Sequence, residues 1–386
     1  MNVIKNAIIY TMENDLIIKN GYIAFDNKII EVSEGQPPEE LLEDALVFDA
    51  HGGVVMPGLI DAHTHIGGVG DSLGFESDDI NEITDPIAPQ LNSLDCVNPL
   101  DRCFKEALKN GVTTVATGPG SANAIAGKII VTKTFGHRID DMVINSPAAM
   151  KFALGENPKG CYHGKNQAPE TRMSTAALIR EALSKALKYR EDIDNSKKED
   201  CDEPEFDSKC DALLPVIKGE LPVHIHAHRA DDIFTAIRIA KEYNLSYNIV
   251  HCTDGHLIAK DLKKENVVPM IGPFLCDRSK PELSGLTLQN CAILEEAGIE
   301  FAIITDHPVI PVQFLLLCAS LAVKGGMTEL GALKAITINP AKILRIDDRV
   351  GSLKVGKDAD IVLYNSEPLN IFSKIKAVFC DGCQVF

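Results

Sequence analysis

The chain has 386 residues, of which 45% are hydrophobic and 24% are charged, and its formal net charge is −17. This composition is typical of a globular protein with one large α/β domain and something smaller, and the negative charge argues against nucleic acids and anionic membranes as main partners. The 11 cysteines form no disulfide framework, the N-terminus lacks a signal-peptide pattern and no apolar run reaches membrane-spanning length, so we expect a cytoplasmic protein.

Short β-rich runs separated by turns fill the first 50 residues. The dipeptides Asn20-Gly21 and Asp26-Asn27 have the composition of turns between such runs. Residues 359–364 and 376–380 are β-rich in the same way. We therefore expect one small β-sandwich built from both ends of the chain, because chain termini often lie close together. Two separate appendages are the alternative.

This arrangement divides the chain into three segments, in which residues 1–57 and 349–386 form the sandwich and residues 58–348 form the large domain. Near the C-terminus, Cys380 and Cys383 have the spacing of a metal or redox pair. The Asp-Gly dipeptide between them predicts a plain hairpin turn, and no second close cysteine pair exists to complete a zinc site.

Apolar runs alternate with helical patterns throughout the large domain. Such alternation predicts parallel strands with helices outside, and its length predicts an α/β fold of the (β/α)8 TIM barrel type. A doubly wound sheet is the alternative, although no glycine-rich phosphate loop follows the first strand. The polar segment 191–211 is predicted as a solvated helix end and loop. The predicted helices are 100–110, 173–190, 231–243, 256–265 and 289–297, and the predicted strands are 112–116, 221–228, 246–251, 267–271 and 300–305.

The segment 54–65 begins as an apolar run, passes Pro57-Gly58 and ends in His63-Thr64-His65. If the run is a strand, its two-residue period places His63 and His65 on the same face. Two imidazoles that project together from a strand end can bind one metal ion. The alternative is a pair of solvated histidines on a loop.

Three histidines alternate along the predicted strand 221–228. Period two places His224, His226 and His228 on one side of this strand, but only one or two of them can reach a single metal ion. We expect His226 to be a metal ligand, His228 to contact the substrate or to support a ligand, and His224 to be buried packing.

Two later strands also end in candidate ligands, since residues 247–251 end in His251 and residues 301–306 end in Asp306. TIM barrels place their active sites at the C-terminal ends of the strands, so these groups should meet His63. A carboxylate that is buried after an apolar run needs a partner, which a metal ion and its water supply. The adjacent His307 would point the other way along an extended strand.

A further ligand is expected from residues 148–158, where two candidates compete. Glu156 follows an apolar run and precedes an Asn-Pro turn signal, so it could bind or bridge metal. Lys151 is the alternative, because a lysine on a strand can be carboxylated and can bridge two metal ions. We favour Glu156 because it lies at the end of the run, as the other candidates do. A capping or surface role for Glu156 is the third possibility.

Imidazole and carboxylate ligands in this proportion suit Zn²⁺, with Mn²⁺, Co²⁺ or Fe²⁺ as alternatives, and carboxylates are too few for a calcium site. A divalent metal lowers the pKa of bound water to about 7 and so provides hydroxide at neutral pH. Asp306 would accept the proton of that water and pass it to a leaving nitrogen. The set therefore predicts hydrolysis of an amide or cyclic amide.

Residues 57–65 resemble the signature of the amidohydrolase superfamily, and so do residues 337–342 and 351–363. The chain is most similar to the imidazolonepropionase-like and prolidase-like branch. The resemblance covers essentially the whole chain and implies a metal-dependent (β/α)8 barrel with a composite β-sandwich, a small-molecule substrate and a homo-oligomer. It implies that one or two divalent ions, most simply zinc, are held by His63 and His65 of the first strand, His226 and His251 of the fifth and sixth, with Asp306 of the eighth as catalytic acid and base.

The chain departs from this pattern in two places. Prolidase-like members carry a carboxylated lysine in a recognisable fourth-strand motif, which is not clear here, whereas Glu156 resembles the glutamate ligand of the N-acetylglucosamine-6-phosphate deacetylase branch. Aromatic-base deaminases carry glutamate three residues after the fifth-strand histidine, where this chain has Arg229, and the position three after His228 is Asp231.

We therefore expect a metal-dependent hydrolase of an amide, cyclic amide or dipeptide-like C–N bond. A deaminase on the same fold is the first alternative, and a catalytically inactive barrel that serves as an assembly subunit is the second. Arg229 could pair with a substrate carboxylate, or it could cap the following helix together with Asp231 and Asp232. Asp254 is a further candidate for substrate contact. The sequence leaves the identity of the substrate open, because specificity depends on loop shape.

Overall fold

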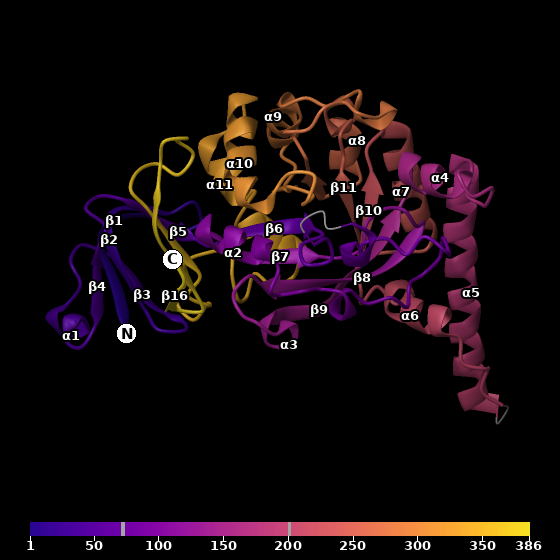
Figure 1. The fold of residues 1–386 in the computed structure, drawn as a ribbon, viewed down its shortest axis with the longest axis horizontal. Helices are drawn as coiled ribbons and strands as arrows, with labels where there is room; N and C mark the ends of the chain where they lie inside the picture. Colours follow the sequence, from indigo (N-terminus) through magenta and orange to yellow (C-terminus); the bar gives the residue numbers. More distant parts are fainter. Residues whose placement is uncertain (71–73, 200–201) are drawn as a thin grey trace.

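The described strands form two eight-stranded sheets (Figure 1). The computed structural model describes residues 1–70, 74–199 and 202–386. The first sheet has the order β16-β15-β14-β5-β1-β2-β3, with β4 paired to β1. Its strands are β1 (Asn2–Tyr10), β2 (Ile17–Phe25), β3 (Ile29–Glu34), β4 (Leu46–Asp49), β5 (Val54–Pro57), β14 (Ile361–Tyr364), β15 (Ile375–Cys380) and β16 (Cys383–Gln384).

Strands from both ends of the chain meet in this first sheet. Strand β5 pairs with β1 in parallel and with β14 in antiparallel orientation, so it joins the N-terminal and C-terminal parts. The rings of Phe25 and Phe379, one from each part, lie edge to face with centroids 4.9 Å apart. Both termini lie on this side of the molecule in Figure 1. The expectation of a small β domain built from both termini is confirmed.

One predicted turn in this sheet is wrong. Asp26 does lie in a turn, where its N–H donates to the carbonyl of Lys28 at 3.0 Å. Asn20-Gly21 instead lies inside β2, next to a shift in the β1–β2 register. A side chain at Gly21 would lie 2.5 Å from the carbonyl oxygen of Ser33, so this glycine permits close strand approach rather than a turn.

The second sheet forms the barrel, in the order β13-β12-β11-β10-β9-β8-β7-β6. Apolar side chains that include Ile60, Val250 and Met270 pack together between these strands and the C-terminal part of the chain. The α/β barrel expected from the alternation of strands and helices is thereby confirmed. The strands are β6 (Leu59–Thr64), β7 (Val112–Thr117), β8 (Ile125–Lys133), β9 (Val143–Ala153), β10 (Val223–Ala227), β11 (Tyr247–His251), β12 (Pro269–Ile271) and β13 (Ala302–Ile303).

Strand β8 departs from the regular alternation, because it runs antiparallel to both β7 and β9. A parallel pair requires a crossover of a dozen residues or more, and residues 118–124 between β7 and β8 are too few to form one. The remaining neighbours in the sheet pair in parallel. The uniform parallel barrel expected from the sequence is therefore corrected at this one strand.

Side-chain and loop contacts bring the two end strands of this sheet together. The hydroxyl of Thr305, just after β13, donates to the Asp61 carboxylate of β6 at 2.6 Å, and the Thr305 N–H approaches the same oxygen at 3.2 Å. The N–H of His65 donates to the carbonyl of His307 at 2.9 Å. These bonds nearly close the barrel without a continuous ladder between β13 and β6.

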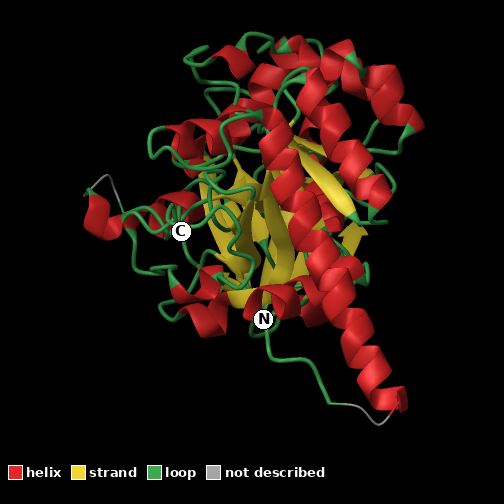
Figure 2. Cartoon of the chain, turned by 90° about the vertical axis from the view of Figure 1, so that its right-hand side faces the viewer, coloured by secondary structure: helices red, strands yellow, loops and turns green. Residues whose placement is uncertain are grey.

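Helices surround the barrel strands, and the long helix α5 extends beyond them (Figure 2). It includes residues 191–199 of the segment 191–211, which was predicted as a solvated helix end and loop, and residues 200 and 201 lie outside the described residues. None of the described helices combines the length and the apolar character needed to cross a bilayer. The main helices are α2 (Arg102–Lys109), α4 (Glu156–His163), α5 (Arg172–Glu199), α6 (Ser208–Ile217), α7 (Ala230–Glu242), α8 (Ala259–Lys264), α9 (Gln289–Glu296), α10 (Leu315–Lys324), α11 (Glu329–Lys334) and α12 (Ile338–Ile343), and the short ones are α1 (Glu39–Leu42) and α3 (Ile139–Met142).

Candidate metal centre

The His63-Thr64-His65 segment lies at the end of β6, where its two imidazoles face Asp306. Pro57 ends β5 in the first sheet and Leu59 begins β6 in the barrel, so the Pro-Gly dipeptide marks the passage between the two sheets. The Nε2 atoms of His63 and His65 lie 3.5 Å and 3.4 Å from Oδ1 of Asp306. The structure thus brings the first-strand and eighth-strand candidates together.

A second set of imidazoles comes from β10 and β11. His226, His228 and His251 are all buried, and each offers a ring nitrogen within 4.8 Å of the others. His251 also belongs to a group with His63 and Asp306 that satisfies the same distance. The His228 and His251 rings stack with centroids 4.3 Å apart. The two groups therefore adjoin and share His251.

Hydrogen bonds to Nδ1 orient three of these rings. Nδ1 of His65 lies 2.7 Å from the carbonyl oxygen of Gly118, and Nδ1 of His251 lies 2.8 Å from that of Gly272. Nδ1 of His228 lies 2.7 Å from the hydroxyl of Thr253. When Nδ1 carries the proton that a carbonyl accepts, Nε2 keeps its lone pair for a metal ion.

Lys151 of β9 reaches the same centre. Its side chain is fully buried, and its Nζ lies 2.8 Å from Nε2 of His63. Burial lowers the pKa of this amine from its usual value near 10.5 to about 8, although the charge of Asp306 opposes the shift. A wholly buried lysine among imidazoles is unusual unless it has a chemical role or a partner there.

Burial lowers the pKa of His63, His226 and His251 well below the usual value, and Lys151 lowers it further. Burial alone would raise the pKa of the Asp306 carboxyl, but His251, His65 and Lys151 outweigh that effect and leave it below its usual value. Uncharged imidazoles beside an ionised carboxylate are the protonation states that a divalent cation requires in its ligands.

The backbone at the centre occupies the left-handed region at several non-glycine residues. His251 has φ of 75°, Cys252 has φ of 47° and Asp306 has φ of 56°. Such conformations cost about 1–3 kcal/mol each and concentrate at functional sites. At His251 and Asp306 they occur where the strand gives way to its loop, and these are the residues that turn their side chains toward the shared centre.

The donor set fits a divalent cation. Both ring nitrogens of His226 are buried and have no hydrogen-bond partner in the described part of the chain. Leaving such a group unsatisfied costs about 1–3 kcal/mol, which a metal–nitrogen bond would offset. Imidazoles combined with one or two carboxylates suit Zn²⁺ and its neighbours in the first transition row.

Glu156 lies outside both groups. It begins helix α4 and is partly exposed, and its carboxylate oxygen Oε2 faces the backbone N–H of Glu282 at 3.4 Å. Of the two candidates in this segment, Lys151 is the one whose side chain approaches an imidazole of the centre.

Arg229 and His224 also lie outside the two groups of possible ligand residues. Arg229 precedes helix α7, and its guanidinium pairs with Asp231 at 2.9 Å on an exposed surface. This pairing agrees with the surface role considered for Arg229, although its side chain makes no capping hydrogen bond to helix α7. His224 is wholly buried and is paired in register with Lys151, and neither of its ring nitrogens has a hydrogen-bond partner in the described ranges.

The sequence did not single out Glu282 or Asp61. Glu282 lies in the 3₁₀ turn η4 (Pro281–Leu283) of the β12–α9 loop, and its Oε1 lies 3.6 Å from Nε2 of both His226 and His228. No strand precedes it directly, so no strand-end pattern could have identified it. Asp61 could have been noticed as a buried carboxylate two residues before His63.

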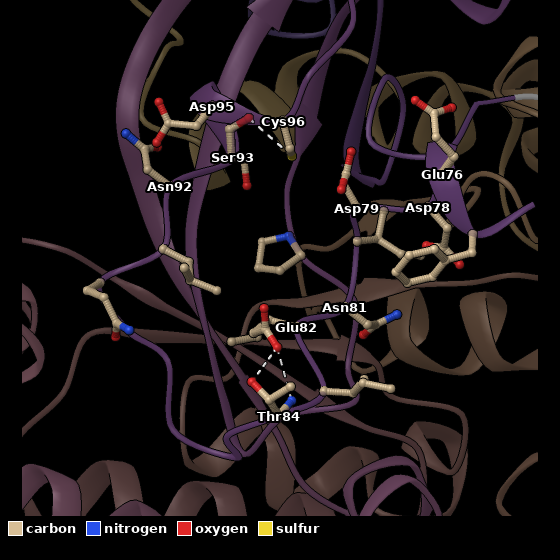
Figure 3. Close-up of a pocket in the computed structure, with 17 residues that line it drawn as sticks. Glu76, Asp78, Asp79, Asn81, Glu82, Thr84, Asn92, Ser93, Asp95 and Cys96 are labelled. Atoms are coloured by element: carbon tan, nitrogen blue, oxygen red, sulfur yellow. Dashed lines mark hydrogen bonds between the residues drawn. The ribbon is translucent and has the colours of Figure 1, made fainter.

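A pocket of about 710 Å³ is lined mainly by the long loop between β6 and α2 (Figure 3). Its wall includes Pro119, which follows the Gly118 carbonyl that orients His65. Several acidic side chains line it, and in Figure 3 the Glu82 carboxylate accepts hydrogen bonds from Thr84. The lining residues include none of the histidines of the centre, so the pocket and the metal centre are distinct features. Its acidic members are Glu76, Asp78, Asp79, Glu82 and Asp95.

Comparison with known proteins places this geometry among related enzymes. A sequence model of the amidohydrolase family matches residues 54–385. A solved amidohydrolase from Thermotoga maritima MSB8 is 38% identical over the full length of both chains, with a TM-score of 0.95. A solved Xaa-Pro dipeptidase is 18% identical with a TM-score of 0.61, covers 99% of each chain and shows likeness of fold alone.

Curated relatives extend the comparison. Amidohydrolase tasK of Hapsidospora irregularis is 29% identical over 96% of this chain, but the chain spans only 40% of that relative's length. Imidazolonepropionase of Fusobacterium nucleatum is 25% identical over 97% of this chain and 94% of its own.

Proposed function

The chain belongs to the amidohydrolase family and is therefore a hydrolase of carbon–nitrogen bonds, and from that premise we propose that it hydrolyses an amide, cyclic amide or dipeptide-like bond of a small substrate. One observation carries the proposal: histidines from three barrel strands and Asp306 converge, with His63, His251 and Asp306 offering ligand atoms within 4.8 Å of one another. Imidazoles kept uncharged by burial have little other reason to gather around a carboxylate at the mouth of a barrel.

We assign the metal-holding role to imidazoles of His63, His65, His226 and His251 together with Asp306. A bound divalent ion, proposed as Zn²⁺, would supply Lewis-acid polarisation of the carbonyl group and acidify water at neutral pH. The protein's part is to hold these ligands in fixed orientation, which the Nδ1 contacts of His65 and His251 accomplish.

Lys151 replaces Glu156 as our candidate for the bridging ligand. Its Nζ is 2.8 Å from Nε2 of His63, whereas Glu156 contacts the backbone N–H and the carboxylate of Glu282. An uncharged lysine amine can add to carbon dioxide, forming a C–N bond and losing a proton, and the product is an anionic carbamate with two ligand oxygens. This modification would place one negative charge among the imidazoles.

Asp306 is proposed as the group that moves the proton. Its carboxylate stands beside Nε2 of both His63 and His65 and is held in the ionised form by its neighbours. It can accept a proton from the attacking water and deliver it to the departing nitrogen. His228, buried beside His251, is our candidate for orienting the substrate carbonyl.

The test combines metal analysis with a chemical panel. Purified protein, stripped of metal and reloaded with Zn²⁺, is assayed for amine release from N-acyl amino acids, dipeptides and lactams, and separately for ammonia release from amino-substituted rings. We expect zinc-dependent amine release that is lost, together with bound metal, in a His63→Ala/His65→Ala variant. A His51→Ala variant is the control, because His51 is exposed and lies in the turn between β4 and β5 of the first sheet.

Two results would contradict the proposal. Equal, near-zero metal content in the wild-type protein and the double variant would remove the metal centre. Ammonia release from ring substrates without any amide cleavage would replace amide hydrolysis with deamination.

We also propose a reducing, cytoplasmic location and a homo-oligomeric assembly. The location is supported by the ten described cysteines, all of which are free thiols. Gel filtration coupled to light scattering would measure the assembly, and a monomeric mass would contradict that part of the proposal.

A further inference from the structure

We infer that Glu282 forms a cation site with His226 and His228 on the β10 side of the centre. The inference deepens the proposed function, because it assigns a ligand set for a second ion beside the one held by His63, His65 and Asp306. Neither His228 nor Glu282 belongs to the ligand set that the chain's resemblance to amidohydrolases implies. Metal binding by His228 would replace the substrate-orienting role given to it above, because its Nδ1 is already bonded to Thr253 and only Nε2 is left to face an ion.

The distances suit a shared ion. Oε1 of Glu282 lies 3.6 Å from Nε2 of His226 and 3.6 Å from Nε2 of His228. Ligand atoms that each lie about 2.0–2.2 Å from one metal ion are about 3–3.6 Å apart in octahedral or tetrahedral geometry. A separation of 3.6 Å is too long for a hydrogen bond between the carboxylate and either imidazole. Oε1 of Glu282 thus faces Nε2 of both imidazoles without a hydrogen bond to either.

One of the two imidazoles is also unsatisfied. Both ring nitrogens of His226 are buried and have no hydrogen-bond partner in the portion of the chain that the structure describes. The Glu282 side chain is only 1% exposed, so its carboxylate needs partners within the protein. A cation between the two side chains would satisfy Nε2 of His226 and would bind Oε1 of Glu282.

The other polar atoms of Glu282 and His228 make contacts that hold Oε1 of Glu282 and Nε2 of His228 toward the proposed site. The N–H of Glu156 donates to Oε2 of Glu282 at 3.1 Å, and Nδ1 of His228 is held by the Thr253 hydroxyl. Gly155 has φ of +84°, and a side chain there would lie 2.9 Å from Oε2 of Glu282. The glycine therefore leaves room for the carboxylate to reach the histidines.

Lys280 places a positive charge on the same oxygen. Its Nζ lies 2.6 Å from Oε1 of Glu282 and 2.9 Å from Oδ1 of Asn157, and its side chain is 28% exposed. The position attracts a cation, and the ammonium group would share the oxygen with a metal ion or swing toward solvent when the ion binds. Lys280 should therefore oppose metal binding, whereas Glu282 should promote it.

Because Glu282 should promote metal binding and Lys280 should oppose it, substitutions at the two positions should change Mn²⁺ affinity in opposite directions. Metal-free wild-type protein is titrated with Mn²⁺, and free Mn²⁺ is followed by electron paramagnetic resonance. We expect two ions per chain in the wild-type protein and only one at the same concentrations in Glu282→Gln, whose second site should be weakened by about 100-fold or more. Lys280→Met should keep both ions and bind the second more tightly. Glu156→Gln is the matched control, because Glu156 is the neighbouring carboxylate, and it should behave as wild type.

Several results would overturn the inference. A Glu282→Gln variant that binds two ions as tightly as the wild type, or a wild type that binds only one, would show that Glu282 pairs with Lys280 and nothing more. If Glu156→Gln lost the second ion and Glu282→Gln kept it, the ligand would be Glu156, and the inference would have named the wrong carboxylate. The proposed function fails separately if Mn²⁺ binding is absent in wild type or unchanged in His63→Ala/His65→Ala.

Discussion

At the scale of single residues, the centre depends on side chains that lie far apart in sequence and together in space. Position at strand ends suggested His63, His65, His226, His251 and Asp306, and the structure brings these side chains near one another, because parallel strands deliver their C-terminal ends to one face. The same rule favoured Glu156 over Lys151, since it ranks a residue by its place along the strand. A ranking by position along the strand does not identify a side chain that turns inward before the strand ends. In β9 that side chain is Lys151.

Residues on loops are the second group whose positions could not be predicted from the sequence. Glu282 reaches the β10 histidines from a 3₁₀ turn whose position is set by contacts with Gly155 and Glu156. Arg229, adjacent to β10, instead pairs with Asp231 at the start of a helix. The sequence around either residue contains no pattern that distinguishes the two outcomes, because both follow from packing of distant segments.

The first prediction concerns Lys151. Substituting Lys151 with alanine removes the amine beside His63 and should lower metal content and reduce kcat/KM by about 100-fold or more. Metal analysis and steady-state kinetics measure both effects. Glu156→Gln serves as the comparison, since it should leave both quantities near wild type. Loss of metal in Glu156→Gln but not in Lys151→Ala would return the bridging role to Glu156.

At the scale of elements, the antiparallel strand β8 joins the barrel to the first sheet. Lys133, its last residue, is buried, and its Nζ lies 2.8 Å from Asp360 and 3.1 Å from both Asp358 and Asp381. All three carboxylates belong to the C-terminal part of the chain. A sequence-based account could not place this cluster, because β8 itself was not anticipated as an antiparallel strand.

The second prediction is that Lys133→Met strongly destabilises the protein. Removing the cation leaves Asp358 and Asp360 buried without their shared partner, which costs about 3–5 kcal/mol. The shift in the urea midpoint measures the loss, with the half-buried Lys128 of the same strand changed to methionine as control. Equal midpoints for the two variants would show that the buried cluster contributes nothing specific.

The third prediction concerns acid sensitivity. Burial raises the pKa of Asp358, but Lys133, Lys28 and Arg349 outweigh it and leave the pKa below its usual value. A carboxyl with a depressed pKa in the folded state stabilises the protein above its unfolded pKa, near 3.9, and loses that contribution as pH falls through the folded value.

Asp358→Asn should therefore be less stable than wild type at pH 7, by about 3 kcal/mol, and the difference should shrink below about pH 4. Urea midpoints at pH 7, 5 and 3 provide the comparison. Asp381 is affected in the opposite direction, because burial raises its pKa, so Asp381→Asn should not reproduce this pH profile. A difference for Asp358→Asn that is constant with pH would contradict the assigned cause.

At the scale of the whole molecule, two sheets share one chain that passes from the first to the second at Gly58. The alternation of strands and helices predicted the barrel, and the β-rich ends predicted the second sheet, since both signals are local and repeated. Local signals could not predict the reversed strand β8 or the way in which β13 and β6 meet. That junction depends on one side chain, Asp61, which binds both the hydroxyl and the N–H of Thr305.

The fourth prediction tests this closure. Asp61→Ala leaves the buried N–H and hydroxyl of Thr305 without their acceptor and should cost about 1–3 kcal/mol for each group, with weaker metal binding because Asp306 adjoins Thr305. Thr305→Val removes only the hydroxyl and should cost less. Thermal unfolding and Mn²⁺ affinity give the two readouts. Equal losses from both variants would assign the closure to the hydroxyl alone.

The central claim is that groups from separate strands hold a divalent cation together. Crystals grown with one equivalent of Zn²⁺ per chain and measured on both sides of the zinc absorption edge test it directly. We expect an anomalous peak about 2.0–2.2 Å from Nε2 of His63, Nε2 of His65 and an oxygen of Asp306. A map with zinc bound elsewhere on the protein and no peak among these three residues would contradict it.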